Sequence, residues 1–150
     1  MSPAKCRPRN RGAIGFTLVE LLIVVIVLAV LAAIAVPRFM DSGQRAKEAS
    51  LRANLKAVRN AVLNFNTDTG YYPAALADLT GKNAPATGKD RTGASRAILS
   101  SNYRGPYLSE VPDDPVSGAP FAYGLSLPNV GKVGSSAAGN GLDGTSYSTW

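Results

Sequence analysis

The chain has 150 residues, with 16 lysines and arginines against 10 aspartates and glutamates, one cysteine and no histidine. The lack of histidine excludes Ser-His and Cys-His nucleophiles and all histidine-ligated metal sites, so we expect no enzyme. A single cysteine excludes a disulfide within the chain, and this length leaves room for one small domain beside any membrane segment.

The first 14 residues are basic and show no helical periodicity. Four positive charges and no negative one precede Gly15: Lys5, Arg7, Arg9 and Arg11. The rest of the chain therefore carries only two of the six net charges. Basic residues directly before an apolar segment indicate a cytoplasmic N-terminus, with the C-terminal part across the membrane. They have no interleaved aromatic residues, so we expect no nucleic-acid partner.

Residues 16–36 form an apolar run whose only charge is Glu20. A helix rises about 1.5 Å per residue, so this run can span a hydrocarbon layer of roughly 30 Å. An acidic side chain near the bilayer centre costs about 2.5 kcal/mol or more, which predicts a functional role for Glu20. The alternative is that Glu20 only reaches the membrane surface from near the helix end.

Beyond this run, an amphipathic helix is expected. Pro37 has no backbone N–H and its ring crowds the preceding turn, so it should kink the helix or end it. Apolar residues then recur at helical spacing up to about residue 66, with 67–70 as the stop: Leu51, Leu55, Val58, Val62 and Phe65. The other faces carry charged side chains, among them Glu48, Arg52 and Arg59.

A small α+β head is predicted after the helix. Leu76 and Leu79 indicate one helical turn, whereas residues 80–97 contain no Val, Ile, Leu or aromatic residue and are expected to be an exposed loop. Strands are expected at 121–125, at 131–133 and near 145–149. A small antiparallel sheet of three or four strands would pack on the apolar stripe of the long helix.

The segment Gly15-Phe16-Thr17-Leu18-Val19-Glu20-Leu21 resembles the N-terminal motif of type IV prepilins and type II secretion pseudopilins. In that motif a basic leader ends in glycine and is followed by Phe-Thr-Leu-x-Glu. The resemblance implies that a membrane prepilin peptidase removes residues 1–15 by cutting between Gly15 and Phe16, and that it N-methylates Phe16. Residues 16–36 would then be a membrane-spanning and later filament-core helix, and 37–150 a pilin-like head that includes the amphipathic half, about 37–66.

Glu20 has a specific partner under this interpretation. The Phe16 amine is largely positive at neutral pH and lies about one helical turn, roughly 6 Å, from Glu20. In a staggered array of parallel helices, Glu20 of one subunit would neutralise the Phe16 amine of its neighbour. Glu20 is therefore expected to be a subunit-assembly residue.

The head resembles most closely that of G-type major pseudopilins. The resemblance rests on several short motifs, among them Gly70-Tyr71-Tyr72-Pro73, Gly105-Pro106-Tyr107-Leu108, Gly118-Ala119-Pro120-Phe121 and the terminal Trp150. The lack of a C-terminal cysteine pair differs from many type IV pilus subunits. Val116-Ser117 departs from the Trp-Gly usual in the family, and residues 80–97 look like an extension.

G-type heads carry a calcium ion in the C-terminal loop, and the resemblance implies Asp143 as a ligand. Calcium takes six to eight oxygen ligands, typically from several carboxylates and carbonyls. Asp143 is the only acidic residue after Asp114, so we expect a reduced site or none and no other cofactor. Asp113 and Asp114 are expected to form a turn.

The sequence thus predicts a structural subunit of a pilus-like filament, most similar to a type II secretion pseudopilus that helps move folded proteins through the outer membrane. One alternative is a type IV pilus subunit for adhesion, motility or DNA uptake. Another is a soluble secreted binding domain, because Ala33-Ile34-Ala35 would allow signal cleavage after Ala35.

The expected partners are further copies of the chain, the prepilin peptidase, an inner-membrane assembly platform with its ATPase, and minor pseudopilins. The expected location is the inner membrane, crossed once with the N-terminus in the cytoplasm and the head in the periplasm, followed by a periplasmic or extracellular filament.

Overall fold

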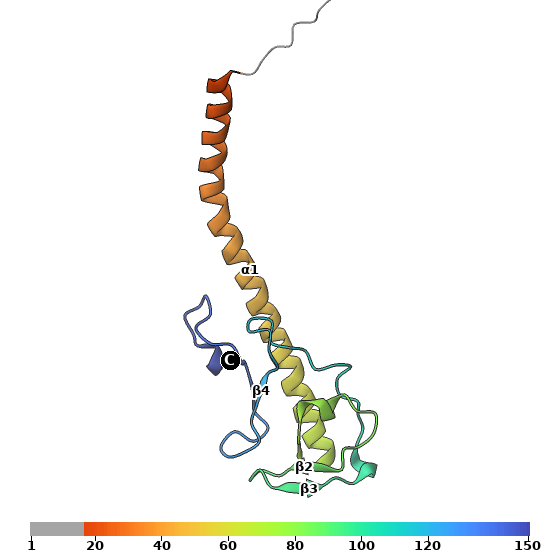
Figure 1. The fold of residues 1–150 in the computed structure, drawn as a ribbon. Helices are drawn as coiled ribbons and strands as arrows, with labels where there is room; N and C mark the ends of the chain where they lie inside the picture. The colour runs from red at the N-terminus through yellow and green to blue at the C-terminus, as the bar shows by residue number, and fades with distance from the viewer. Residues whose placement is uncertain (1–16) are drawn as a thin grey trace, which may run out of the picture. The chain divides into compact units, whose positions relative to one another are not determined.

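The structure, a computed structural model, describes residues 17–150, with the side chains of 36–41 outside the description (Figure 1). The chain divides into two compact units, Met1–Met40 and Asp41–Trp150. Gly15 and Phe16, at the predicted cleavage site, lie outside the described residues, so cleavage and N-methylation there stay predictions.

The long helix α1 runs from Leu18 to Thr69. The helix therefore does not end at Pro37, which leaves the kink as the alternative that stays a prediction. Thr17 begins the helix, since its hydroxyl Oγ1 accepts a hydrogen bond from the backbone N–H of Glu20 at 3.2 Å. Its carbonyl also accepts from the N–H of Leu21 at 3.2 Å. Thr17 is thus the N-cap, which satisfies a donor that the first helical turn leaves without a partner.

Apolar side chains dominate the N-terminal part of α1. The 18 residues from Leu18 to Ala35 have a mean hydropathy of 3.2, and none of them is buried within the chain. By length and composition this stretch can cross a membrane. Since its large apolar side chains are exposed, lipid or other helices must cover them.

The C-terminal part of α1 presents one apolar stripe to the head. All five residues predicted for this stripe are at most 3% exposed: Leu51, Leu55, Val58, Val62 and Phe65. They form one core with side chains from the second half of the chain, among them Leu79, Phe121, Val133 and Tyr147. The helix ends where predicted, because Gly70 takes φ +80°, a left-handed conformation that glycine adopts without penalty.

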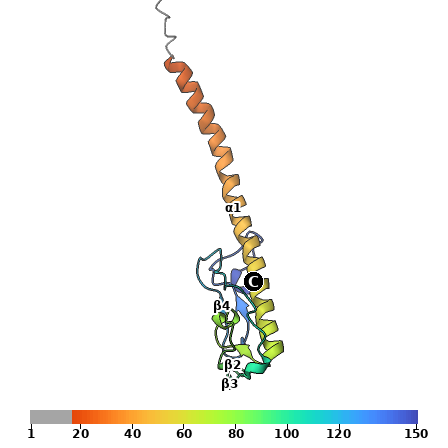
Figure 2. The ribbon, with the colours of Figure 1, turned by 90° about the vertical axis from the view of Figure 1, so that its right-hand side faces the viewer.

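Two small antiparallel sheets complete the head, so the predicted α+β class is confirmed but the prediction of a single sheet of three or four strands is wrong. The first contains β1 (Tyr72–Pro73), β2 (Thr87–Lys89) and β3 (Ser95–Ala97) in that order, and the second pairs β4 (Ala122–Tyr123) with β5 (Val133–Gly134). Both sheets lie along the C-terminal part of α1, with β2 and β3 near its end (Figure 1, Figure 2).

Three short 3-10 helices lie between and after the strands: η1 (Leu76–Leu79), η2 (Ser100–Asn102) and η3 (Tyr147–Thr149). The predicted turn at Leu76 and Leu79 is confirmed by η1. The strand predicted near 145–149 is wrong, because η3 occupies most of that range. Tyr147 and Trp150 are three residues apart, so the 3-10 turn places their rings edge to face, with the ring centroids 5.0 Å apart.

The expectation of an exposed loop over residues 80–97 is wrong for residues 87–97, because β2 and β3 form a hairpin there. Polar contacts hold its turn. The carboxylate Oδ1 of Asp90 accepts from the N–H groups of Thr92 and Ala94 at 2.9 and 3.0 Å, and Oδ2 pairs with Arg96 Nε at 2.9 Å. Hydrogen bonds therefore stabilise this hairpin without an apolar alternation.

Candidate functional site: two faces of the long helix

The first candidate site is the start of α1, where Glu20 lies in the first turn and is exposed. Its backbone is held by Thr17, but its proposed partner, the Phe16 amine, lies outside the described residues. The role of Glu20 in assembly stays a prediction. Sequence reasoning missed the cap, although Thr17-Leu18-Val19-Glu20 has the Thr-x-x-Glu spacing of a capping box.

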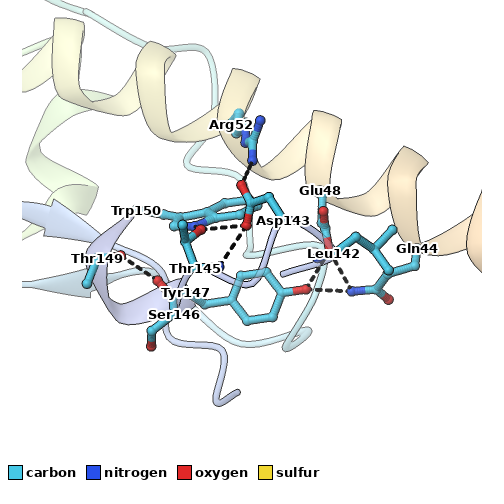
Figure 3. A network of polar contacts seen from close by, with 10 residues as sticks. All are labelled: Gln44, Glu48, Arg52, Leu142, Asp143, Thr145, Ser146, Tyr147, Thr149 and Trp150. Atoms are coloured by element: carbon cyan, nitrogen blue, oxygen red, sulfur yellow. Dashed lines mark hydrogen bonds and ion pairs between the residues drawn. The ribbon is translucent and has the colours of Figure 1, made fainter. Parts of the chain in front are cut away.

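The second candidate site is the contact between α1 and the C-terminal loop, here residues 139–150. Figure 3 shows that Gln44, Glu48 and Arg52 point from the helix toward this loop. They lie four residues apart, so they follow one another along one face of α1. Sequence reasoning placed Glu48 and Arg52 away from the apolar stripe but did not find that they contact the loop.

Glu48 is 7% exposed and accepts three hydrogen bonds at Oε1. The donors are Gln44 Nε2 at 3.2 Å, the Tyr147 hydroxyl at 2.8 Å and the backbone N–H of Leu142 at 3.0 Å. Burial raises the pKa of Glu48, but these hydrogen bonds together outweigh burial and bring it below its ordinary value. Glu48 is therefore a charged acceptor that fixes two points of the loop.

Arg52 and Asp143 form an ion pair one helical turn further along, with Nη2 and Oδ2 2.6 Å apart. The other oxygen of Asp143, Oδ1, accepts from the N–H and the hydroxyl of Thr145 at 2.9 and 2.6 Å. These hydrogen bonds and the charge of Arg52 lower the pKa of Asp143. Both carboxylate oxygens of the sequence-predicted metal ligand thus have protein donors.

Two arginines contact Trp150. The Arg52 guanidinium carbon lies 4.2 Å from the centroid of the Trp150 ring, a cation–π distance. Arg59 donates to the carbonyl oxygens of Trp150 and, at 2.9 Å, of Val133. Trp150 Nε1 in turn donates to the Thr145 hydroxyl at 2.6 Å. The end of the chain is therefore held on α1 by charged and aromatic contacts.

Asp114 is another buried carboxylate of the head, and its residue surface is 0% exposed. Oδ1 accepts from the N–H groups of Val116 and Ser117 at 2.8 and 3.2 Å. Oδ2 accepts from the Ser135 hydroxyl and from the N–H of Ser136, the latter at 3.1 Å. Asp114 forms a turn as expected, and it also joins that turn to the segment after β5.

Burial raises the pKa of Asp114, but the four hydrogen bonds outweigh burial and lower the pKa below its ordinary value. Asp114 is therefore a charged structural group, fully enclosed by its own donors. This carboxylate has no free oxygen to offer a ligand.

Comparison with known proteins assigns both parts of the chain. Residues 10–36 match the prokaryotic N-terminal methylation motif, and residues 38–146 match the family described as type II secretion system (T2SS), protein G. No solved structure matches the chain significantly.

Several curated proteins are similar in sequence. The type II secretion system core protein G of Aeromonas hydrophila is 30% identical over 138 residues, which cover 91% of this chain and 87% of that protein. The core protein G of Pseudomonas aeruginosa is 32% identical over 115 residues, 77% of this chain and 75% of that protein. The type IV major pilin PilA of Myxococcus xanthus is 42% identical over 72 residues, 48% of this chain but only 31% of the pilin.

The match to protein G begins at residue 38, just after the apolar segment, and includes both sheets and most of the core and of the C-terminal loop. The long helix, the α+β head and the N-terminal methylation motif are all consistent with this family. The chain belongs to the type II secretion system protein G family.

Proposed function

We propose that the chain is the repeating subunit of a type II secretion pseudopilus. One observation carries the proposal: residues 18–35 are apolar apart from Glu20 and unburied, and they are joined to a head of the protein G family. A helix that is apolar on all faces is stable only in lipid or among other apolar helices. Membrane storage followed by packing into a filament core gives this segment both surroundings in turn.

Processing of the N-terminus is part of the proposal. The match to the N-terminal methylation motif over residues 10–36 supports cleavage between Gly15 and Phe16 and methylation of the Phe16 amine. The mature chain then begins next to Thr17, whose cap fixes the first helical turn. Glu20 is exposed in that turn and would meet the Phe16 amine of a neighbouring subunit.

Orientation and partners are further parts of the proposal. The basic leader supports a cytoplasmic N-terminus and a periplasmic head. Subunits would be added by an inner-membrane platform and its ATPase, together with minor pseudopilins, and the filament would help move folded proteins through the outer membrane. The protein would act as a structural element and not as an enzyme.

A type IV pilus subunit is the second candidate, supported by the similarity to PilA. That similarity covers 48% of this chain, whereas the match to the core protein G of Aeromonas hydrophila covers 91%. The head therefore favours the pseudopilus. A secreted binding domain cut after Ala35 is the contrasting class.

The decisive experiment replaces the chromosomal copy with variants in the source organism. Mass spectrometry of the mature protein should show N-methylated Phe16 as the first residue, whereas a start at Val36 would refute the pilin interpretation. Glu20→Ala should be inserted and processed normally but give few filaments and reduced secretion. Glu110→Ala, which removes an exposed acidic residue of the head, is the control and should behave as the wild type.

If the filaments assemble normally with Glu20→Ala, the pairing of Glu20 with Phe16 is wrong. If deletion of the protein abolishes surface pili but leaves protein secretion unchanged, the chain is a type IV pilus subunit instead.

A further inference from the structure

The C-terminal loop, residues 139–150, buries too little apolar surface to be held by packing alone. Tyr147 is its only buried large side chain, at 2% exposure, and Leu142 is 50% exposed. The chain has no cysteine in the head that could tie the loop down. The resemblance to G-type heads implies a calcium ion in this loop. Other contacts must hold the loop in this protein if no such ion is bound.

We propose that the guanidinium of Arg52 replaces the metal ion, so that the head holds its C-terminal loop without calcium. The Asp143 carboxylate, the one predicted ligand, has Arg52 Nη2 at 2.6 Å on Oδ2 and two Thr145 donors on Oδ1. A calcium ion at Asp143 would have to displace this charged partner, although both side chains of the pair are partly exposed, at 58% and 44%.

The surrounding donors do not fit calcium either. Calcium takes six to eight oxygen ligands, usually several of them carboxylates. Among the side chains that the structure describes, no group of three or more acidic, cysteine or histidine residues is placed to hold a metal ion. Another carboxylate that contacts the loop, that of Glu48, already accepts from Gln44, Tyr147 and Leu142. The carboxylates of Glu48 and Asp143 therefore accept hydrogen bonds from protein donors and are not arranged to bind a hard cation.

Arg52 does more than neutralise Asp143, because its planar group also covers the Trp150 ring at 4.2 Å. The loop is packed closely around that ring, since a Cβ added at Gly141 would lie 2.7 Å from a Trp150 ring carbon. A lysine carries the same charge but cannot bind the carboxylate in a fixed plane and stack on the indole together. We therefore expect the arginine itself to be required.

The chain offers a direct optical probe, because Trp150 is its single tryptophan. The full chain is purified in detergent micelles, and Trp150 emission and the melting temperature are measured in EGTA and in excess Ca²⁺. Both should be the same in the two conditions. Tb³⁺, a calcium analogue, should give no luminescence sensitised by Trp150. A lower melting temperature in EGTA, or sensitised Tb³⁺ emission that Ca²⁺ displaces, would overturn the proposal.

Variants test the role of Arg52 itself. Arg52→Gln should shift Trp150 emission to the red and lower the melting temperature by roughly 2–5 °C. Arg52→Lys should recover only part of this loss. Arg45→Gln is the matched control, since it removes the same charge from an exposed position of α1, and it should leave both readings unchanged. Asp143→Asn should reproduce the red shift of Arg52→Gln, and equal behaviour of Arg52→Gln and Arg45→Gln would refute the proposal.

Discussion

Replacing Asp114 by asparagine tests the role of its buried carboxylate at nearly constant side-chain volume. The carboxylate accepts four hydrogen bonds, two at each oxygen, and the residue is 0% exposed. Asparagine keeps one acceptor oxygen and introduces an NH₂ donor at the other position. The Ser135 hydroxyl can rotate to accept from this NH₂, but the N–H of Ser136 is then left facing a donor.

The expected cost follows from these contacts. The hydrogen bond from the Ser136 N–H to the charged acceptor is lost, the one with the Ser135 hydroxyl is reversed, and the remaining bonds weaken because the acceptor is neutral. Hydrogen bonds to charged groups contribute about 1.5–3 kcal/mol each, so the free energy of unfolding should fall by about 2–3 kcal/mol. For a unit of this size, that corresponds to a melting temperature lower by roughly 8–12 °C.

The measurement is thermal unfolding of the full chain in detergent, followed by near-UV circular dichroism. Asp113→Asn is the control, because it makes the same chemical change at the adjacent exposed residue and should cost under about 0.5 kcal/mol. The folded-state pKa of Asp114 is lowered, so its stabilisation is present above the unfolded-state pKa and is lost as the pH falls through the folded-state pKa. The difference between Asp114→Asn and wild type should therefore shrink in acid. Equal melting temperatures for the two asparagine variants at neutral pH would refute the reasoning.

Three further predictions concern other parts of the chain. Glu48→Gln should loosen the C-terminal loop, and on acidification the variant should lose less stability than the wild type does, because the folded-state pKa of Glu48 lies below its ordinary value. Acid titrations monitored by Trp150 emission check this. Gly88→Ala should lower the free energy of unfolding by about 1–3 kcal/mol, since the new Cβ would lie 2.8 Å from the Tyr72 carbonyl oxygen. Gly43→Ala lies in α1 with open space around the new Cβ, so it should raise the free energy of unfolding by up to about 1 kcal/mol. Denaturant titration measures both. Thr17→Val should reduce helicity at the start of α1 without unfolding the head, because the N-cap hydroxyl is lost; hydrogen exchange at the first turn measures this, and unchanged protection would contradict the cap.

The long helix was predictable from the sequence because its signal repeats many times. A period of 3.6 residues recurs through the stripe from Leu51 to Phe65, and each step adds evidence for the same buried face. The end of the helix was predictable as well, since Gly70 has the conformation that glycine supplies there. Both features depend on residues close together in the chain.

The hairpin of β2 and β3 could not be predicted in this way. All three residues of β3 are exposed, so no apolar alternation marks the strand. The turn depends on Asp90 accepting from Thr92 and Ala94, a pattern that an exposed loop of the same composition also permits. What distinguishes the hairpin from a loop is that β2 also pairs with β1. That pairing joins residues that are not neighbours in the sequence, such as Tyr72 and Lys89.

The contacts of Glu48 and Arg52 were hidden for a related reason. Their partners Leu142 and Asp143 lie 94 and 91 residues further along the chain. A charged residue beside an apolar stripe usually faces water, and nothing local distinguishes one that meets a returning loop. The Thr-x-x-Glu spacing that starts the helix at Thr17 is different, because it is local and readable from the sequence alone.

The two halves of α1 therefore differ in where their apolar side chains find partners. The half within Asp41–Trp150 buries its apolar stripe in its own core and places Glu48 and Arg52 on the C-terminal loop, so the head supplies its own partners. The stretch from Leu18 to Ala35 buries nothing within the chain and must obtain its partners from lipid or from other subunits. Changes at Arg52 should consequently affect the stability of each subunit before assembly, whereas changes at Glu20 should affect addition to a filament and leave subunit stability unaltered. Effects at separate, independent sites add, so a variant changed at both residues should show the melting loss of one and the assembly loss of the other, with no further coupling.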